Sequence, residues 1–197
     1  MSNAAAQNIE KRAATIGTTD TESGRTIEGY AALFNSRTEI WTGFFEEIAP
    51  GAFKNAIGKS DVRALFNHDQ NRILARTSSG TLTIGEDSKG LWYRFEMPDT
   101  TEGNDLLVMI RRGDISQSSF AFTVRASEWI EEADGSTLRV ITDCEMLYDV
   151  SPVTYPAYQD TSVTARKKAE EAPKKPEPVD FGYFERQLRL LEIDSLI

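Results

Sequence analysis

The sequence predicts a mainly β domain with peripheral helices, an α+β fold, and three observations support this prediction. Short apolar runs bounded by glycine, proline and asparagine recur along the chain, which is typical of buried strands. Leu91, Tyr93, Phe95 and Met97 recur with period two, as on the buried face of a half-buried strand. Inside the domain only two segments combine helical apolar spacing with residues that begin or end helices. The 197-residue chain, 40% hydrophobic and 27% charged, is long enough for one main core.

The chain is expected to divide into four segments. Residues 1–24 are small and polar and are expected to form a flexible N-terminal arm, and residues 25–166 form the domain. Residues 167–180 are expected to be a linker, because Lys, Glu, Ala and Pro dominate them and cannot build a core. Residues 181–197 carry apolar side chains at helical spacing. We expect an amphipathic helix there, which docks on its own domain, on a dimer mate or on a partner.

The first elements of the domain are two strands and a short helix. Residues 26–34 form an apolar run that indicates a buried strand. Residues 40–48, rich in aromatic side chains, indicate a second strand. Residues 52–57 follow a Pro-Gly pair, have apolar residues at helical spacing and end at Gly58, so they indicate a short helix.

The middle of the domain is expected to hold a strand, a hairpin and a second helix. Residues 62–66 indicate a strand that runs directly into an Asn-His-Asp sequence. Residues 81–84 and 91–97 flank a polar, glycine-containing turn and indicate a hairpin. Capping residues then precede a helix that extends to about Arg112, and Gly113 ends it.

The last elements of the domain are expected to be a second strand pair. Residues 118–129 and 137–147 read as strands joined by a turn that contains Asp-Gly. Residues 148–158 continue as extended chain that contains two prolines.

Composition excludes several classes of protein. The 22 Lys and Arg against 31 Asp and Glu give a net charge of −9, which repels phosphate and argues against a nucleic-acid partner. No apolar run reaches the roughly 18–20 residues that a membrane helix needs. The first thirty residues lack the apolar segment of a secretory signal, so no membrane association or export is expected. Cys144 is the single cysteine and cannot form an intrachain disulfide, which fits a reducing cytoplasm.

No cofactor or metal is expected. The chain contains no phosphate-binding glycine loop, no dinucleotide fingerprint and no paired cysteines. His68 is the single histidine, so a zinc site would depend on several carboxylates. Any histidine acid–base chemistry must also use His68.

Three groups of side chains could together support nucleophilic catalysis. They are His68, the serines Ser116, Ser118 and Ser119, and the acidic pair Glu145 and Asp149. A serine nucleophile needs a base within hydrogen-bond reach and a group that orients the base, and these groups supply one of each. The plainer interpretation is that the histidine ends a strand and that the serines cover a polar sheet face.

Strand alternation favours one serine but leaves the acid open. If residues 118–124 are a strand, Ser118 shares its face with the phenylalanines, whereas Ser119 lies beside the small Ala121 on the other face. Ser119 is therefore the better nucleophile candidate. Glu145 and Asp149 fall on the same face of their strand, so period two does not separate them.

Five short sequences appear in a specific order. They are Gly29-Tyr30-Ala31; Pro50-Gly51-Ala52-Phe53; Leu65-Phe66-Asn67-His68-Asp69; Arg111-Arg112-Gly113-Asp114-Ile115 with Ser119-Phe120-Ala121-Phe122; and Tyr148-Asp149-Val150-Ser151-Pro152-Val153-Thr154-Tyr155-Pro156-Ala157-Tyr158. In this order, over about residues 26–165, the chain resembles the tailed-phage prohead proteases. These capsid-maturation serine peptidases are related in fold to the herpesvirus assembly proteases. The resemblance implies a closed β-barrel of the herpesvirus-protease type.

The resemblance also implies a role for each candidate. His68 would be the general base and Ser119 the nucleophile, and Asp149, where the family has glutamate, would orient His68. Glu145 remains the alternative, because Asp is one methylene shorter than Glu. The herpesvirus relatives use a second histidine here, which this chain lacks. Ala121 stands where the family usually has glycine.

The resemblance implies a serine endopeptidase that acts during procapsid maturation. Its substrates would be the major capsid protein, a scaffold segment and itself, inside the procapsid in the cytoplasm of a bacterial host, and a homodimer could form. The two departures from the family pattern keep a non-catalytic capsid assembly or scaffolding protein as the alternative. A third alternative is an unrelated β-barrel binding module.

Overall fold

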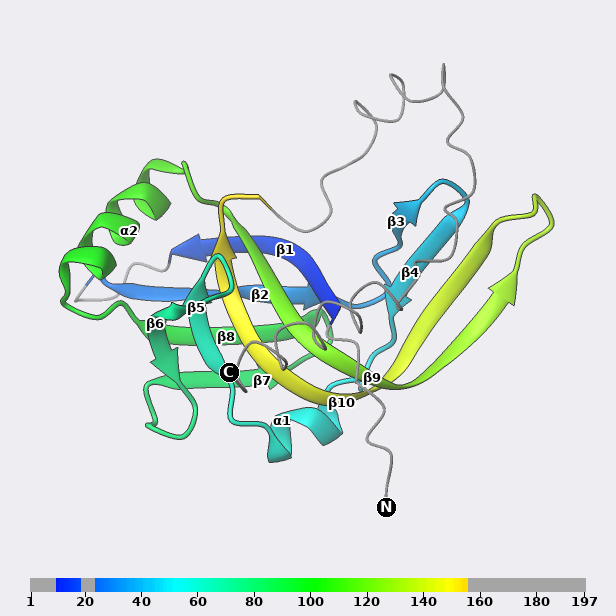
Figure 1. The fold of residues 1–197 in the computed structure, drawn as a ribbon, viewed down its shortest axis with the longest axis horizontal. Coiled ribbons are helices and arrows are strands. Elements are labelled where there is room, and N and C mark those ends of the chain that lie inside the picture. Colours follow the sequence, from blue (N-terminus) through cyan, green and yellow to red (C-terminus); the bar gives the residue numbers. More distant parts are fainter. Residues whose placement is uncertain (1–9, 19–23, 156–197) are drawn as a thin grey trace, which may run out of the picture. The chain divides into compact units, whose positions relative to one another are not determined.

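The structure is a computed structural model that describes residues 10–18 and 24–155 (Figure 1). By its internal contacts the chain divides into two units, residues 1–160 and 161–197, and the described residues lie in the first. The expected linker at 167–180 and the expected helix at 181–197 lie outside the described residues.

Strands dominate the described residues, as the sequence predicts. The strands are β1 (Glu10–Thr18), β2 (Thr26–Leu33), β3 (Thr38–Trp41), β4 (Phe44–Ile48), β5 (Arg63–Phe66), β6 (Asp69–Arg76), β7 (Leu82–Glu86), β8 (Gly90–Glu96), β9 (Gln117–Glu131) and β10 (Thr137–Val153). The helices are α1 (Lys54–Lys59) and α2 (Thr101–Arg112). Neither of these two helices is long and apolar enough to cross a membrane.

The strands pair in the order β3-β4-β10-β9-β1-β2-β8-β7, and a β5–β6 hairpin branches from β10. Most pairs are antiparallel, but β4 and β5 both run parallel to β10. They share one edge of β10, because β4 pairs with residues 137–141 and β5 pairs with residues 149–150. Figure 1 shows β9 and β10 as a long hairpin whose tip projects beside β3 and β4.

The expected closed β-barrel is wrong, because no sheet in the described part of the chain closes on itself. A barrel requires every strand to have a partner on both edges. Here the described pairing ends at β3 and β7, and β6 pairs only with β5. Register shifts between Ile141 and Asp149 mark bulges in β10. Bulges bend a strand and increase its twist. In Figure 1 the distal half of the hairpin extends beside β3 and β4 and away from β2, β7 and β8.

Strand β1 lies inside the segment expected to be a flexible arm. Its residues 10–15 pair with β9 and its residues 16–18 pair with β2. It is therefore the strand that joins the β9–β10 part of the sheet to the β2–β8–β7 part. The sequence of β1 lacks the apolar alternation that predicts a strand. It is a strand because its backbone pairs with β9 on one part of its length and with β2 on the other.

Three further elements differ from the sequence prediction. The expected strand at 40–48 is divided into β3 and β4 by a turn in which Gly43 has φ 79°. Strand β6 was not predicted, because polar residues fill its first half and only Leu74 and Ala75 are buried. The extended chain expected after residue 147 is part of β10 as far as Val153.

Helix α2 forms where its capping residues predict it. The Thr100 side chain accepts a hydrogen bond from the Gly103 amide, and Gly113 ends the helix with φ 82°. Leu106, Leu107 and Ile110 are buried on one face.

The core aligns the strand that carries the serines. Phe120 is fully buried, meets Phe53 of the helical turn before α1 edge to face at 5.5 Å, and stacks on Phe122 at 4.7 Å. Alternation then directs Ser119 to the opposite face of β9.

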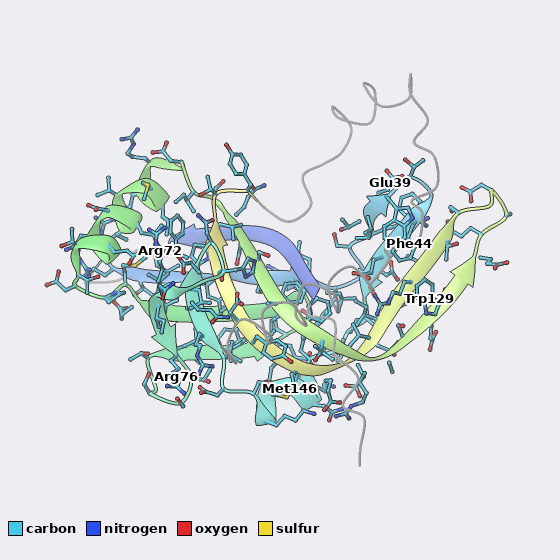
Figure 2. The ribbon with its side chains drawn as sticks, in the orientation of Figure 1. Glu39, Phe44, Arg72, Arg76, Trp129 and Met146 are labelled. Carbon is cyan, nitrogen blue, oxygen red and sulfur yellow. The ribbon has the colours of Figure 1, made fainter. Side chains whose placement is uncertain are left out.

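A separate aromatic cluster joins the distal hairpin to β3 and β4. Phe44 stacks between Trp41 and Trp129, with ring centroids 4.1 Å and 5.6 Å apart (Figure 2). The two tryptophans are mostly exposed, whereas Phe44 is buried. This cluster holds the projecting part of the sheet together at its far end.

Candidate active site

His68 lies in the tight turn between β5 and β6. Phe66 and Asp69 pair across the ladder, so Asn67 and His68 form a two-residue hairpin loop. Both loop residues are left-handed, with φ 55° and 57°, as a type I′ turn requires. Positive φ is uncommon for residues other than glycine, although asparagine and histidine are both enriched there. The turn therefore holds the imidazole in an uncommon backbone conformation.

Asn67 fastens this turn to the end of β10. Its amide donates to the Pro152 carbonyl at 3.0 Å. Its side-chain Nδ2 donates to Thr154 Oγ1 at 3.1 Å, and its Oδ1 accepts from the Thr154 amide at 2.8 Å. Three hydrogen bonds thus fix the position of the turn relative to the strand that carries Asp149.

Ser119 and Asp149 lie on neighbouring strands and on one face of the sheet. Ser119 of β9 is opposite Ser151 of β10, and Ala121 is opposite Asp149. Directly opposed residues of an antiparallel pair project on the same side. The four side chains therefore form a small group on the face opposite the aromatic core.

The structure brings Ser119, His68 and Asp149 into one hydrogen-bonded chain. His68 Nε2 lies 2.8 Å from Ser119 Oγ, and His68 Nδ1 lies 2.6 Å from Asp149 Oδ1. An ionised carboxylate only accepts, so Nδ1 carries the proton and Nε2 accepts from the serine hydroxyl. Ser119 is fully buried, and the side chains of His68 and Asp149 are each 10% exposed. Sparse solvent strengthens both hydrogen bonds.

Glu145 is not part of this chain. Its carboxylate binds Lys59 Nζ at 2.5 Å and also Arg125 Nε. The hydrogen bonds from Arg125 and Lys59 lower the pKa of Glu145 to about 2. The geometry therefore brings Asp149, and not Glu145, to His68.

The other two serines of the cluster lie outside this chain as well. Ser118 is fully buried on the opposite face of β9, beside the Tyr93 hydroxyl. Ser116 is exposed just before β9 begins.

Sequence reasoning missed two residues at this site. Asn67 belongs to one of the family-like motifs but has no predicted role of its own, although asparagine in a turn is a signal for a left-handed loop. Ser151 was not singled out, yet its Oγ donates to Asp149 Oδ1 at 2.6 Å. Its position two residues after an acid on the same strand could have suggested that contact.

The chain also matches a known protein family. Residues 8–176 match the model of the caudovirus prohead serine protease family. The chain belongs to this family. The resemblance found in the sequence is thereby confirmed.

This member of the prohead protease family is similar to a second protein in sequence and to a solved structure in fold. It is 28% identical over 148 residues to the prohead protease of Enterobacteria phage HK97, an alignment that covers 73% of this chain and 61% of that protein. The chain therefore spans about three-fifths of the length of that relative. The structure of the bacteriophage T4 capsid assembly protease superposes with a TM-score of 0.49 and 13% identity, over 74% of this chain and 96% of the other.

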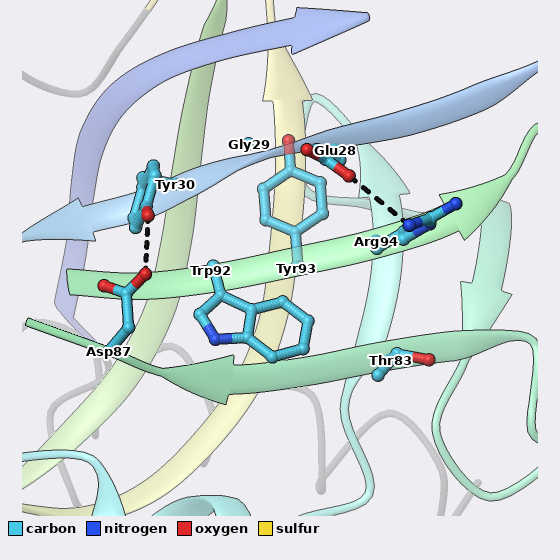
Figure 3. Close-up of a pocket in the computed structure, with 8 residues that line it drawn as sticks. All are labelled: Glu28, Gly29, Tyr30, Thr83, Asp87, Trp92, Tyr93 and Arg94. Atoms are coloured by element: carbon cyan, nitrogen blue, oxygen red, sulfur yellow. Dashed lines mark hydrogen bonds and ion pairs between the residues drawn. The ribbon is translucent and has the colours of Figure 1, made fainter. Parts of the chain in front are cut away.

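A pocket of about 470 Å³ lies elsewhere on this family member, on β2, β7 and β8 (Figure 3). Ser119, His68 and Asp149 do not line it. Its polar groups pair with one another: Tyr30 Oη donates to Asp87 at 2.6 Å, which raises the pKa of Tyr30, and Arg94 lies 3.7 Å from Glu28. In the described residues no group of three or more His, Cys, Asp or Glu side chains could hold a metal ion.

Proposed function

We propose that this protein is a serine endopeptidase in which Ser119 is the nucleophile, His68 the general base and Asp149 the group that orients His68. The observation that carries the proposal is the hydrogen-bonded chain from Ser119 Oγ through both ring nitrogens of His68 to Asp149 Oδ1. Membership of a serine protease family supports the same assignment.

The proposed reaction is acyl transfer. His68 Nε2 takes the hydroxyl proton while Ser119 Oγ forms a bond to the peptide carbonyl carbon. Asp149 stabilises the imidazolium, which then gives its proton to the leaving amine as the peptide C–N bond breaks. A water molecule, activated by the same imidazole, hydrolyses the acyl-enzyme and restores the serine hydroxyl.

We further propose that the substrates are the major capsid protein and a scaffold segment, inside the procapsid in the bacterial cytoplasm. The name of the HK97 relative, a prohead protease, supports this choice. The chain itself is a third proposed substrate, cleaved within the linker expected at 167–180, because charged side chains and prolines there favour an extended, accessible backbone.

Intact-mass spectrometry after exposure to a fluorophosphonate tests the proposal. Ser119 Oγ would attack phosphorus and expel fluoride, and His68 would take the proton, so the wild-type chain gains one adduct. Ser119→Ala should gain none. Ser118→Ala is the matched control, since it removes a neighbouring buried hydroxyl on the opposite face of β9, and it should be labelled like the wild type.

The same spectra test self-cleavage. The wild type and Ser118→Ala should lose a C-terminal fragment, whereas Ser119→Ala should keep its full mass. Labelling or cleavage that persists in Ser119→Ala would contradict the assignment. A wild-type chain that is neither labelled nor cleaved, alone or when co-expressed with its capsid protein, would favour a non-catalytic assembly protein.

A further inference from the structure

We propose that Ser151 is a positioning residue that holds the Asp149 carboxylate toward His68. This inference rests on the proposed function and extends the catalytic chain by one residue. In this role Ser151 does not contact the substrate.

The first observation is a shared acceptor atom. Asp149 Oδ1 accepts from Ser151 Oγ at 2.6 Å and from His68 Nδ1 at 2.6 Å. The carboxylate only accepts, so the serine hydroxyl is the donor of the first of these hydrogen bonds. Two donors on one oxygen fix the carboxylate both in place and in rotation.

The second observation is the burial of the hydroxyl. Ser151 is fully buried, and a buried hydroxyl without a partner is costly. The hydrogen bond to Asp149 therefore satisfies the buried Ser151 hydroxyl, and it lies on the face that carries the candidate site.

The third observation is the register of β9 and β10. Asp149 and Ser151 are two residues apart and project on the same side, and Ser151 lies directly opposite Ser119. The same strand pair thus positions both Ser119, the proposed nucleophile, and Ser151, which donates to Asp149. A short aspartate needs such support, because it has to reach an imidazole on a separate hairpin.

The role follows from the tautomer of His68. The imidazole can take a proton from Ser119 only while Nδ1 carries its hydrogen and Nε2 presents a lone pair. Asp149 enforces that tautomer as long as Oδ1 faces Nδ1. Without the Ser151 donor the carboxylate can rotate, and a fraction of the imidazole adopts the other tautomer.

NMR of the imidazole measures this effect directly. His68 is the single histidine, so a ¹⁵N-labelled chain gives one set of ring-nitrogen signals. The wild type should show a protonated Nδ1 and an unprotonated Nε2 at a pH where the ring is neutral. Ser151→Ala should shift both nitrogen signals toward a mixture of tautomers. The matched control Ser118→Ala, an equally buried serine on the neighbouring strand, should leave them unchanged.

Fluorophosphonate kinetics give the second readout. Ser151→Ala should lower the maximal labelling rate about 10- to 100-fold, the range expected when a catalytic group is misaligned by roughly 1 Å. The concentration that gives half of the maximal rate should stay within about twofold of the wild type, because Ser151 is not assigned to binding of the reagent. A purely structural role would lower the melting temperature without moving the nitrogen signals.

The two proposals can fail separately. Wild-type imidazole signals and an unchanged labelling rate in Ser151→Ala would overturn the role of Ser151 and leave the serine peptidase intact. If the wild-type chain is never labelled, the proposed function fails, and the NMR comparison alone still decides whether Ser151 controls the orientation of Asp149.

Discussion

At the scale of single residues, the left-handed turn that carries His68 is the most constrained part of the candidate site. Asn67 occupies a backbone conformation in which a residue with a plain Cβ costs about 1–2 kcal/mol. Its side chain also makes two of the three hydrogen bonds that join the turn to β10. The position of the imidazole therefore depends on a residue that need not touch the substrate.

Asn67→Ala should destabilise the protein by about 2 kcal/mol, since it adds backbone strain and removes both side-chain hydrogen bonds. It should also slow fluorophosphonate labelling. Urea denaturation measures the first effect. Asn71→Ala is the control, because Asn71 is exposed in the same hairpin, where its backbone amide and its side chain donate hydrogen bonds to Asp69. Equal destabilisation by the two substitutions would contradict the anchoring role.

The candidate site could be predicted in part at this scale. Alternation alone favours Ser119 over Ser118, and Ser119 is the serine that contacts His68 because β9 is regular around its phenylalanines. Alternation could not separate Glu145 from Asp149, because β10 is irregular between them. Register shifts on both sides of Met146 and Leu147 rotate Glu145 toward Lys59 and Arg125. Such bulges leave no clear mark in the sequence.

At the scale of elements, Glu145 joins three of them. Lys59 ends α1, Arg125 belongs to β9 and Glu145 belongs to β10, so one carboxylate links the helix to both strands of the hairpin. The charges are partly exposed, so each pair alone contributes little. Two cations on one carboxylate nevertheless depress its pKa to about 2.

Glu145→Gln should reduce stability at neutral pH and not at low pH. The folded pKa of Glu145, about 2, lies below its ordinary value of 4.5, so its contribution is present above pH 4.5 and is lost as the pH falls toward 2. The difference in melting temperature between wild type and variant should therefore shrink between pH 5 and pH 2. Glu128→Gln, on an exposed part of β9, is the control and should show no such trend. A constant difference would exclude the ion pairs as its cause.

Predictions of elements succeeded where local chemistry decides the structure. Helix α2 has a threonine cap, a glycine stop and one apolar face, and it forms as expected. Strands β1 and β6 are polar along much of their length, and their neighbours in the sheet determine them. A sequence read without those neighbours gives no signal for either strand.

At the scale of the whole domain, β1 is the strand on which continuity of the sheet depends. Because β1 lies between β9 and β2, its loss would leave an unpaired edge on each. Exposed strand edges pair with other chains. The closed barrel, by contrast, was carried over from the fold of relatives, and pairing order is a tertiary property that short motifs do not specify.

Deletion of residues 1–18 should therefore cause aggregation, seen as increased light scattering and as loss of the main peak in size-exclusion chromatography. Deletion of residues 1–7, which precede the family match, retains β1 and serves as the control. If the protein lacking residues 1–18 keeps its main size-exclusion peak and does not scatter more light, β9 and β2 need no strand between them.

The complete burial of Ser119 has a kinetic consequence if it is the nucleophile. A peptide bond reaches Ser119 Oγ only in a minor conformation that exposes the hydroxyl, which we call the uncovered form. The observed cleavage rate is then the intrinsic rate multiplied by the population of that form. An uncovered population of about one in a thousand would correspond to about 4 kcal/mol. Any molecule that binds the uncovered form alone raises this population by mass action. Such a peptidase has very low activity at low substrate concentration. A high local concentration of its own substrate is enough to raise that activity.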